Sequence, residues 1–168
     1  MRIRDALEQL LECAEAQLET PVCRSFINPG ANAPHDSCEK GPNGSDGQLW
    51  VANIGSTAGW PQFTGDPITC ATPFAETIEL GITRCALGKL KDTAPWVPPA
   101  EDVTTDALQQ QTDKLALKNA ILCCWGVSGK DMLPPIWEPI EPFGGCVGGT
   151  WTIVLRDATC LCEPVESS

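Results

Sequence analysis

The chain has 168 residues, of which 42% are hydrophobic and 20% are charged, as in ordinary globular domains. One core is enough at this length, so we predict a single domain over residues 1–168. The 22 acidic and 11 basic residues give a formal net charge of −11, which argues against a conventional nucleic-acid binder because the average surface repels phosphate.

The N-terminal segment predicts an amphipathic helix over residues 2–18, because apolar residues recur there at steps of three and four. Acidic residues lie among its leucines and no small-residue cleavage site follows, so we do not expect a signal peptide. No stretch approaches the ~18 apolar residues that cross a bilayer, so we expect no membrane segment. Pro21 ends the helix, and residues 28–47 are rich in turn formers, which predicts a long ordered loop.

Two strands are predicted next, over residues 48–54 and 76–87. In the second, Ile78, Leu80 and Ile82 alternate with more polar positions, the period of a half-buried sheet. Residues 89–99 contain three prolines, so we predict a projecting connection there.

A second helix is predicted to begin near Asp102 or Thr104, to run to about Trp125 and to end at Gly126. We expect its buried side to include Ala107, Leu108, Gln111, Leu115 and Leu122, with Leu117, Ile121 and Cys124 beside them.

The C-terminal part begins with a Pro-rich stretch, residues 133–142, and a Gly-rich one, residues 144–149, which we predict to be connections. A final strand over residues 150–156 follows, with Trp151, Ile153 and Leu155 on one face. The predicted fold is therefore an α+β domain in which two amphipathic helices pack on a mixed or antiparallel β-sheet with long Pro/Gly-rich loops.

The ten cysteines make up about 6% of the chain, below the ~8–10% that marks a disulfide-built scaffold. Four lie in regular segments, where we interpret them as buried thiols: Cys13, Cys85, Cys123 and Cys124. The other six lie in loop-like sequence and could oxidise in a particle that leaves the cell: Cys23, Cys38, Cys70, Cys146, Cys160 and Cys162. Their pairing cannot be read from the sequence.

Candidate catalytic and metal-binding motifs are weak. His35, the single histidine, lies in turn-rich sequence without a nucleophile motif. The segment GVSGK at 126–130 lacks the spacing of a phosphate loop, so we interpret it as a turn that ends the helix. Neither Cys160-x-Cys162 nor the adjacent Cys123 and Cys124 has zinc-site spacing. We predict no catalytic residue, no cofactor and no metal ion, and hence no enzyme.

The six tryptophans are better candidates for contacts with other proteins, since four of them lie near prolines or glycines in loop-like sequence rather than in core segments. Trp96 is the leading candidate, with Val97 beside it and Trp137 in the second Pro-rich stretch. The alternative, to which we give equal weight for any single tryptophan, is that it covers the core beneath a long loop.

Four segments carry a family resemblance: MRIRDALEQLLECAEAQLE, FAETIELGITRCAL, TTDALQQQTDKLALKNAIL and GGCVGGTWTIVLRD. In this order they resemble the tail-terminator and neck proteins of long-tailed bacteriophages, most closely those of actinobacteriophages. The resemblance implies a structural virion protein that forms a ring, commonly a hexamer, which caps the tail tube and joins it to the head. The implied partners are further copies of itself, the tail tube protein and a head-completion or stopper protein. DNA would pass nearby without specific binding, and the ring would assemble in the host cytoplasm.

Three alternatives stay open. The chain could be another head-to-tail connector, a stopper or an adaptor. An extracellular disulfide-containing binding module is favoured by the cysteine count and opposed by the lack of a signal sequence. A small enzyme would need two of the 22 carboxylates to meet in a cleft.

Overall fold

Five strands form one mixed sheet, in the order β1-β2-β3-β5-β4, in the computed structural model of the chain. The three central strands, β2 (Gln48–Ala58), β3 (Phe74–Cys85) and β5 (Cys146–Asp157), pair antiparallel with one another. At the edges, β1 (Arg24–Asn28) runs parallel to β2, and β4 (Ile136–Phe143) is antiparallel to β5. The structure describes residues 3–30, 33, 41, 44–61, 65, 67–69, 71–86, 98–143 and 145–157.

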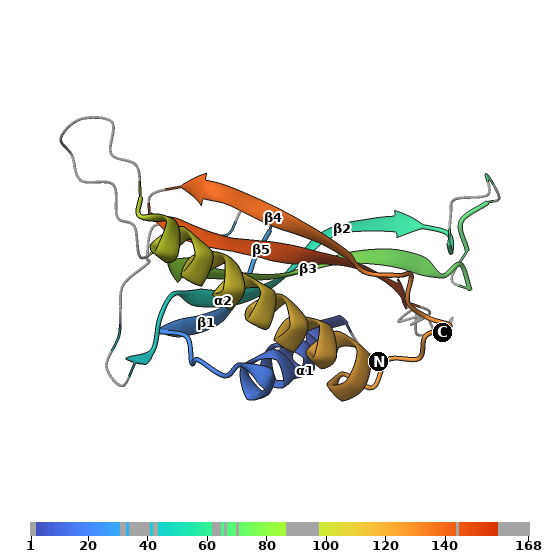
Figure 1. Ribbon diagram of the computed structural model, residues 1–168. Coiled ribbons are helices and arrows are strands. Elements are labelled where there is room, and N and C mark those ends of the chain that lie inside the picture. The colour runs from blue at the N-terminus through green and yellow to red at the C-terminus, as the bar shows by residue number, and fades with distance from the viewer. Residues whose placement is uncertain are drawn as a thin grey trace.

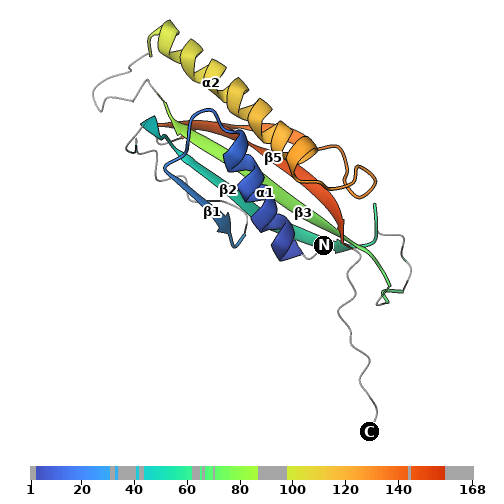
Figure 2. The same cartoon turned by 90° about the horizontal axis from the view of Figure 1, so that it is seen from below.

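Both long helices, α1 (Ile3–Gln17) and α2 (Ala100–Asn119), lie across the same face of this sheet (Figures 1 and 2). A sheet with one apolar face is stable when other elements cover that face, and the two helices do so here. The chain is thus a single compact α+β domain with two helices on a five-stranded mixed sheet, and this part of the predicted fold is confirmed.

The core lies between the sheet and the helices. Leu80 pairs with Trp151, and Ile78 pairs with Ile153, so these alternating side chains point to the same face. All four are buried, together with Ile82 and Leu155. The predicted inward faces of both strands are therefore correct.

The first helix buries the side that its periodicity predicts. Its fully or nearly buried residues recur at steps of three and four: Ala6, Leu7, Leu10, Cys13 and Ala14. The glutamates at positions 8, 12 and 15 do not lie on that side.

The second helix buries a different side from the predicted one. Leu108, Leu115 and Leu122 are exposed, and so are Ala107 and Gln111. The residues that face the sheet are Asp113, Ala116, Leu117, Ala120 and Ile121, so only Leu117 and Ile121 were placed correctly. Two apolar stripes run along this helix, and periodicity alone does not choose between them. The stripe with the small alanines lets the helix approach the sheet closely, and it includes the aspartate that pairs with a buried arginine.

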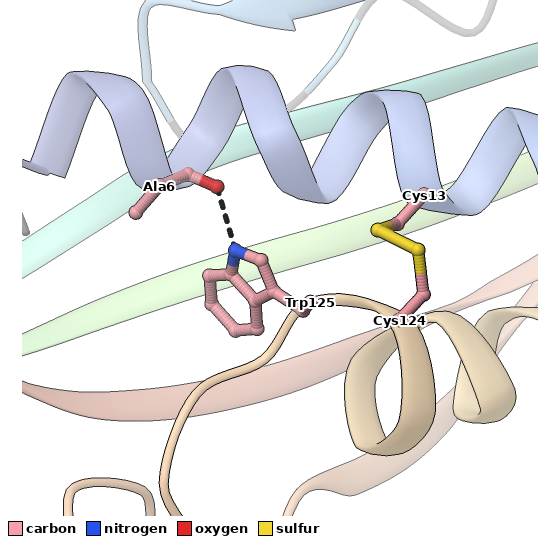
Figure 3. Close-up of a disulfide and its surroundings, with 4 residues drawn as sticks. All are labelled: Ala6, Cys13, Cys124 and Trp125. Atoms are coloured by element: carbon pink, nitrogen blue, oxygen red, sulfur yellow. Dashed lines mark hydrogen bonds between the residues drawn. A yellow bond between two sulfur atoms is a disulfide. The ribbon is translucent and has the colours of Figure 1, made fainter.

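A π-helical turn, η2 (Ala120–Cys124), follows α2, with Trp125 N donating to Ala120 O at 2.9 Å. A π-helical turn contains one residue more than an α-helical turn. Trp125 follows it and is buried, and its Nε1 donates a hydrogen bond to Ala6 O at 2.8 Å (Figure 3). Beside it, Cys124 forms a disulfide with Cys13 of α1 (Figure 3). The end of the second helix is therefore fastened to the first.

The disulfide corrects the interpretation of the cysteines in regular segments. Cys13 and Cys124 are not thiols but a pair whose Cα atoms lie 5.7 Å apart. Cys123 keeps its thiol but is exposed, and only Cys85 is the buried thiol that was predicted. Cys146 is also disulfide-bonded.

Both edge strands were missed in the sequence. Residues 133–142 were predicted to be a connection, yet β4 begins at Ile136. Its two prolines are compatible with a strand because β4 pairs with β5 on one side only. The Gly-rich stretch was also predicted to be a connection, but β5 begins at Cys146. The loops predicted at 28–47 and 89–99 lie largely outside the described residues.

Candidate functional site

The outer side of α2 and of the following turn η2 carries exposed leucines, which we call the outer ladder: Leu108 and Leu115 on α2, and Leu122 on η2. Their side chains are 64%, 54% and 52% exposed. Seven residues of an α-helix make nearly two turns, so Leu108 and Leu115 lie above one another, and Leu122 follows them on the wider π-helical turn. Leu115 is two residues, or about 200° of helical rotation, from the buried Asp113, and the ladder therefore points away from the sheet.

The ladder concentrates exposed apolar surface on one element. Single leucines on a protein surface are ordinary, whereas several large exposed apolar side chains on one element favour a contact with another molecule. Eight large hydrophobic side chains are exposed in the described part of the chain, and four of them belong to α2 and its π-helical continuation. This helix face is the surface of the described structure best suited to a protein partner.

Of the three predicted interface residues, Trp96 and Val97 lie outside the described residues. Trp137 lies on β4 and is half-buried. Its ring centre is 5.5 Å from that of Trp151, and Lys114 Nζ of α2 lies 5.8 Å above the ring. Trp137 thus joins the edge strand to the second helix, and its role in an interface stays a prediction.

Arg84 and Asp113 form a buried ion pair between β3 and α2, which the sequence did not predict. Arg84 Nε donates to Asp113 Oδ2 at 3.0 Å and Nη2 donates to Oδ1 at 2.9 Å. Both side chains are almost fully buried, at 4% and 2% exposure. A two-pronged contact of this kind fixes the rotation of α2 as well as its distance from the sheet.

The remaining N–H groups of Arg84 hold the backbone. Nη2 also donates to Thr20 O at 2.7 Å, while Nη1 donates to Pro21 O at 3.1 Å and to Asp46 O at 2.6 Å. All five donors of the guanidinium therefore have partners within the chain. Arg84 has no N–H group left for a ligand, so we assign it to the architecture rather than to binding.

A cavity with a volume of about 430 Å³ opens beside the N-terminal end of α1. Its polar lining includes Glu76, Ser128, Asp131, Arg156 and Asp157. The carboxylate of Glu76 accepts hydrogen bonds from Asn53 and Ser56, and Arg156 lies 3.6 Å from Asp131. Glu76, Asp131 and Arg156 are thus engaged in contacts within the chain. Among the described residues that line the cavity, we find no nucleophile with an adjacent base.

The weak sequence motifs that lie in the described residues have a structural role. In the segment 126–130, Gly126 has a φ of 72° and Asp131 N donates to Ser128 O, which makes it a turn after the helix as predicted. His35, Cys160 and Cys162 lie outside the described residues. Within the described ranges, no group of three or more His, Cys, Asp or Glu side chains could hold a metal ion.

No protein-family model matches the chain, and no curated protein shows significant similarity to it. None of the helices in the described part of the chain is long and apolar enough to cross a membrane. The outer ladder is therefore the feature from which a function can best be argued.

Proposed function

We propose that the chain is a structural virion protein of the neck of a long-tailed bacteriophage, acting as the tail terminator. In this role a ring of copies, commonly six, caps the finished tail tube and offers a docking surface to the filled head. Its partners would be the tail tube protein and a head-completion or stopper protein.

The exposed leucine ladder carries this proposal. A single-domain protein that keeps three leucines exposed on one helix face is suited to protein contacts rather than to chemistry on a small molecule. The buried guanidinium, which elsewhere could mark a binding site, is fully occupied by the chain itself. The order of elements that underlies the family resemblance supports the same reading.

The net charge of −11 suits a ring through which DNA must slide. Lysine and arginine contacts to phosphate release counterions and so make DNA bind. A predominantly acidic subunit offers few such contacts, so DNA could pass without being held.

The test is assembly on tails. Purified protein is mixed with tail tubes from a phage lysate that lacks this chain, and the tubes are examined by negative-stain electron microscopy together with light scattering of the free protein. We expect a closed ring at one tube end and recovery of joining to filled heads. A protein that neither forms rings nor binds tube ends would refute the terminator role. Rings that bind heads but not tubes would instead favour a stopper or adaptor.

A second candidate, an extracellular disulfide-containing binding module, is favoured by the Cys13–Cys124 disulfide and by the disulfide of Cys146. Thiol titration of the unfolded protein separates the two. Protein taken from virions and from the host cytoplasm before lysis should differ in thiol count if oxidation follows release. A secreted module would already carry its disulfides, including Cys13–Cys124, when it is first isolated, so its thiol count would not change.

A further inference from the structure

We propose that the Cys13–Cys124 disulfide is a reversible redox latch between α1 and η2. In this latch Cys124 exchanges with thiols and disulfides in solution, and Cys13 closes the bond or leaves it. The latch is independent of the terminator role. Three features of the contact support it: the unequal exposure of the two cysteines, the contacts that lie beside the disulfide, and the two elements that it joins.

The two cysteines differ in their access to solvent. Cys13 lies on the buried side of α1 and is 6% exposed, whereas Cys124, the last residue of η2, is exposed. Thiol–disulfide exchange requires the attacking thiolate to reach one of the two sulfurs, so its rate depends on access. A small thiol in solution therefore attacks Cys124 Sγ, and Cys13 is the group that leaves.

The exchange needs only a small thiol, RSH, as its co-reactant. To open the latch, RS⁻ bonds to Cys124 Sγ, the bond to Cys13 breaks, and the Cys13 thiolate takes up a proton. A second RS⁻ attacks the R sulfur of the mixed disulfide, so RSSR leaves and Cys124 takes up a proton. Two RSH are thus oxidised to RSSR while the protein disulfide is reduced to two thiols. The latch closes by the same steps in reverse, since Cys124 attacks RSSR and Cys13 then displaces RS⁻.

The contacts beside the disulfide hold the helices together when the latch is open. Trp125 is 1% exposed, and its Nε1 donates to Ala6 O at 2.8 Å (Figure 3). Leu10 of α1 and Ile121 of η2 are buried in the same core. None of these contacts requires the bond between the sulfurs. We therefore expect the chain to stay folded as a dithiol, which distinguishes a latch from a disulfide on which folding depends.

The latch acts on the helical layer and not on the sheet. Both of its cysteines belong to helical elements, one near the C-terminal end of α1 and the other at the end of η2. Segments of a folded protein open locally with different free energies, and a crosslink between two segments opposes their separate opening. The closed latch should therefore protect η2 and the end of α1, and leave the central strands unchanged.

The first experiment follows the full wild-type chain in mixtures of reduced and oxidised dithiothreitol, a dithiol that supplies both thiols of the exchange. Alkylation and peptide mass spectrometry give the state of Cys13 and Cys124 apart from the other cysteines, and circular dichroism measures the fold. We expect the pair to open and close reversibly without loss of secondary structure. Hydrogen exchange of the η2 amides should be at least about tenfold faster in the open state.

Three results of this experiment would overturn the latch. The first is reduction that occurs only where denaturant unfolds the chain. The second is a reduced chain that is unfolded, because the disulfide would then be a condition of folding. The third is equal hydrogen exchange of η2 in the two states, because the bond would then restrain nothing.

The second experiment identifies the exchanging sulfur in a Cys123→Ser background, which removes the exposed neighbouring thiol. Cys13→Ser leaves Cys124 alone, and the matched Cys124→Ser leaves Cys13 alone. With oxidised glutathione we expect Cys124 to form the mixed disulfide at least about tenfold faster than Cys13, because only Cys124 is exposed. Equal rates would overturn the two roles.

A variant that does not fold leaves the roles testable in the Cys123→Ser chain itself. Brief exposure to reduced glutathione, followed by acid quenching, traps the first mixed disulfide. Glutathione found on Cys124 supports the assignment, and glutathione found on Cys13 contradicts it.

Discussion

The buried ion pair gives the sharpest test of how the domain is held together. Replacing Asp113 by Asn keeps the volume of the side chain but removes the negative charge that faces the Arg84 guanidinium. The two side chains are 4% and 2% exposed, so water cannot take over the lost interaction. Removing one partner of a buried pair leaves an uncompensated charge, and we expect a loss of about 3–5 kcal/mol in the free energy of unfolding.

In a domain of this size each kcal/mol corresponds to about 2–4 °C in Tm, so the Asp113→Asn variant should melt about 10 °C lower. Guanidinium denaturation checks this, with the midpoint falling and the slope unchanged. The matched control is Glu8→Gln, which breaks an exposed ion pair with Arg4 and should change the midpoint little. Equal midpoints for the two variants would show that solvent reaches Arg84 and that the pair does not organise the fold.

Two further predictions concern the other fixed points of the fold. Replacing Cys13 and Cys124 together by alanine removes a crosslink between positions 111 residues apart, and we expect the free energy of unfolding to fall by about 2–4 kcal/mol. The control variant, Cys123→Ser, should leave the denaturation midpoint unchanged. Equal midpoints for the two variants would contradict the structural role of the disulfide. Ile153→Asp places a charge in the core and should prevent folding, while Thr152→Asp on the opposite face of the strand should still fold. Circular dichroism measures both variants, and equal tolerance of the two substitutions would refute the strand register.

The central strands and the first helix could be predicted because one simple period governs each of them. Ile78, Leu80 and Ile82 alternate cleanly, and α1 has a single apolar side, so burial follows the pattern. The edge strands lack such a signal. The prolines of β4 are typical of a connection. A strand tolerates them here because β4 is an edge strand, with a neighbour on one side only.

The second helix was misjudged for a different reason. Large leucines were taken as the buried side, while the sheet contacts the stripe of Ala116 and Ala120. What decides between the stripes is the partner of Arg84, and no local pattern shows that Arg84 on β3 must meet a carboxylate 29 residues further along the chain. The disulfide between Cys13 and Cys124 escaped prediction in the same way, because its 111-residue separation is bridged only by the folded sheet.

The two long-range contacts that the sequence hides also determine how the ladder is presented. Toward its middle, α2 is held in rotation by the two-pronged contact of Asp113 with Arg84. At its C-terminal end, the π-helical turn brings Cys124 to Cys13 and Trp125 to the backbone of α1. A helix fixed at both places cannot turn its leucines inward to relieve their exposure. The same contacts that stabilise the domain therefore keep an apolar surface facing solvent, and that surface is free to meet another protein.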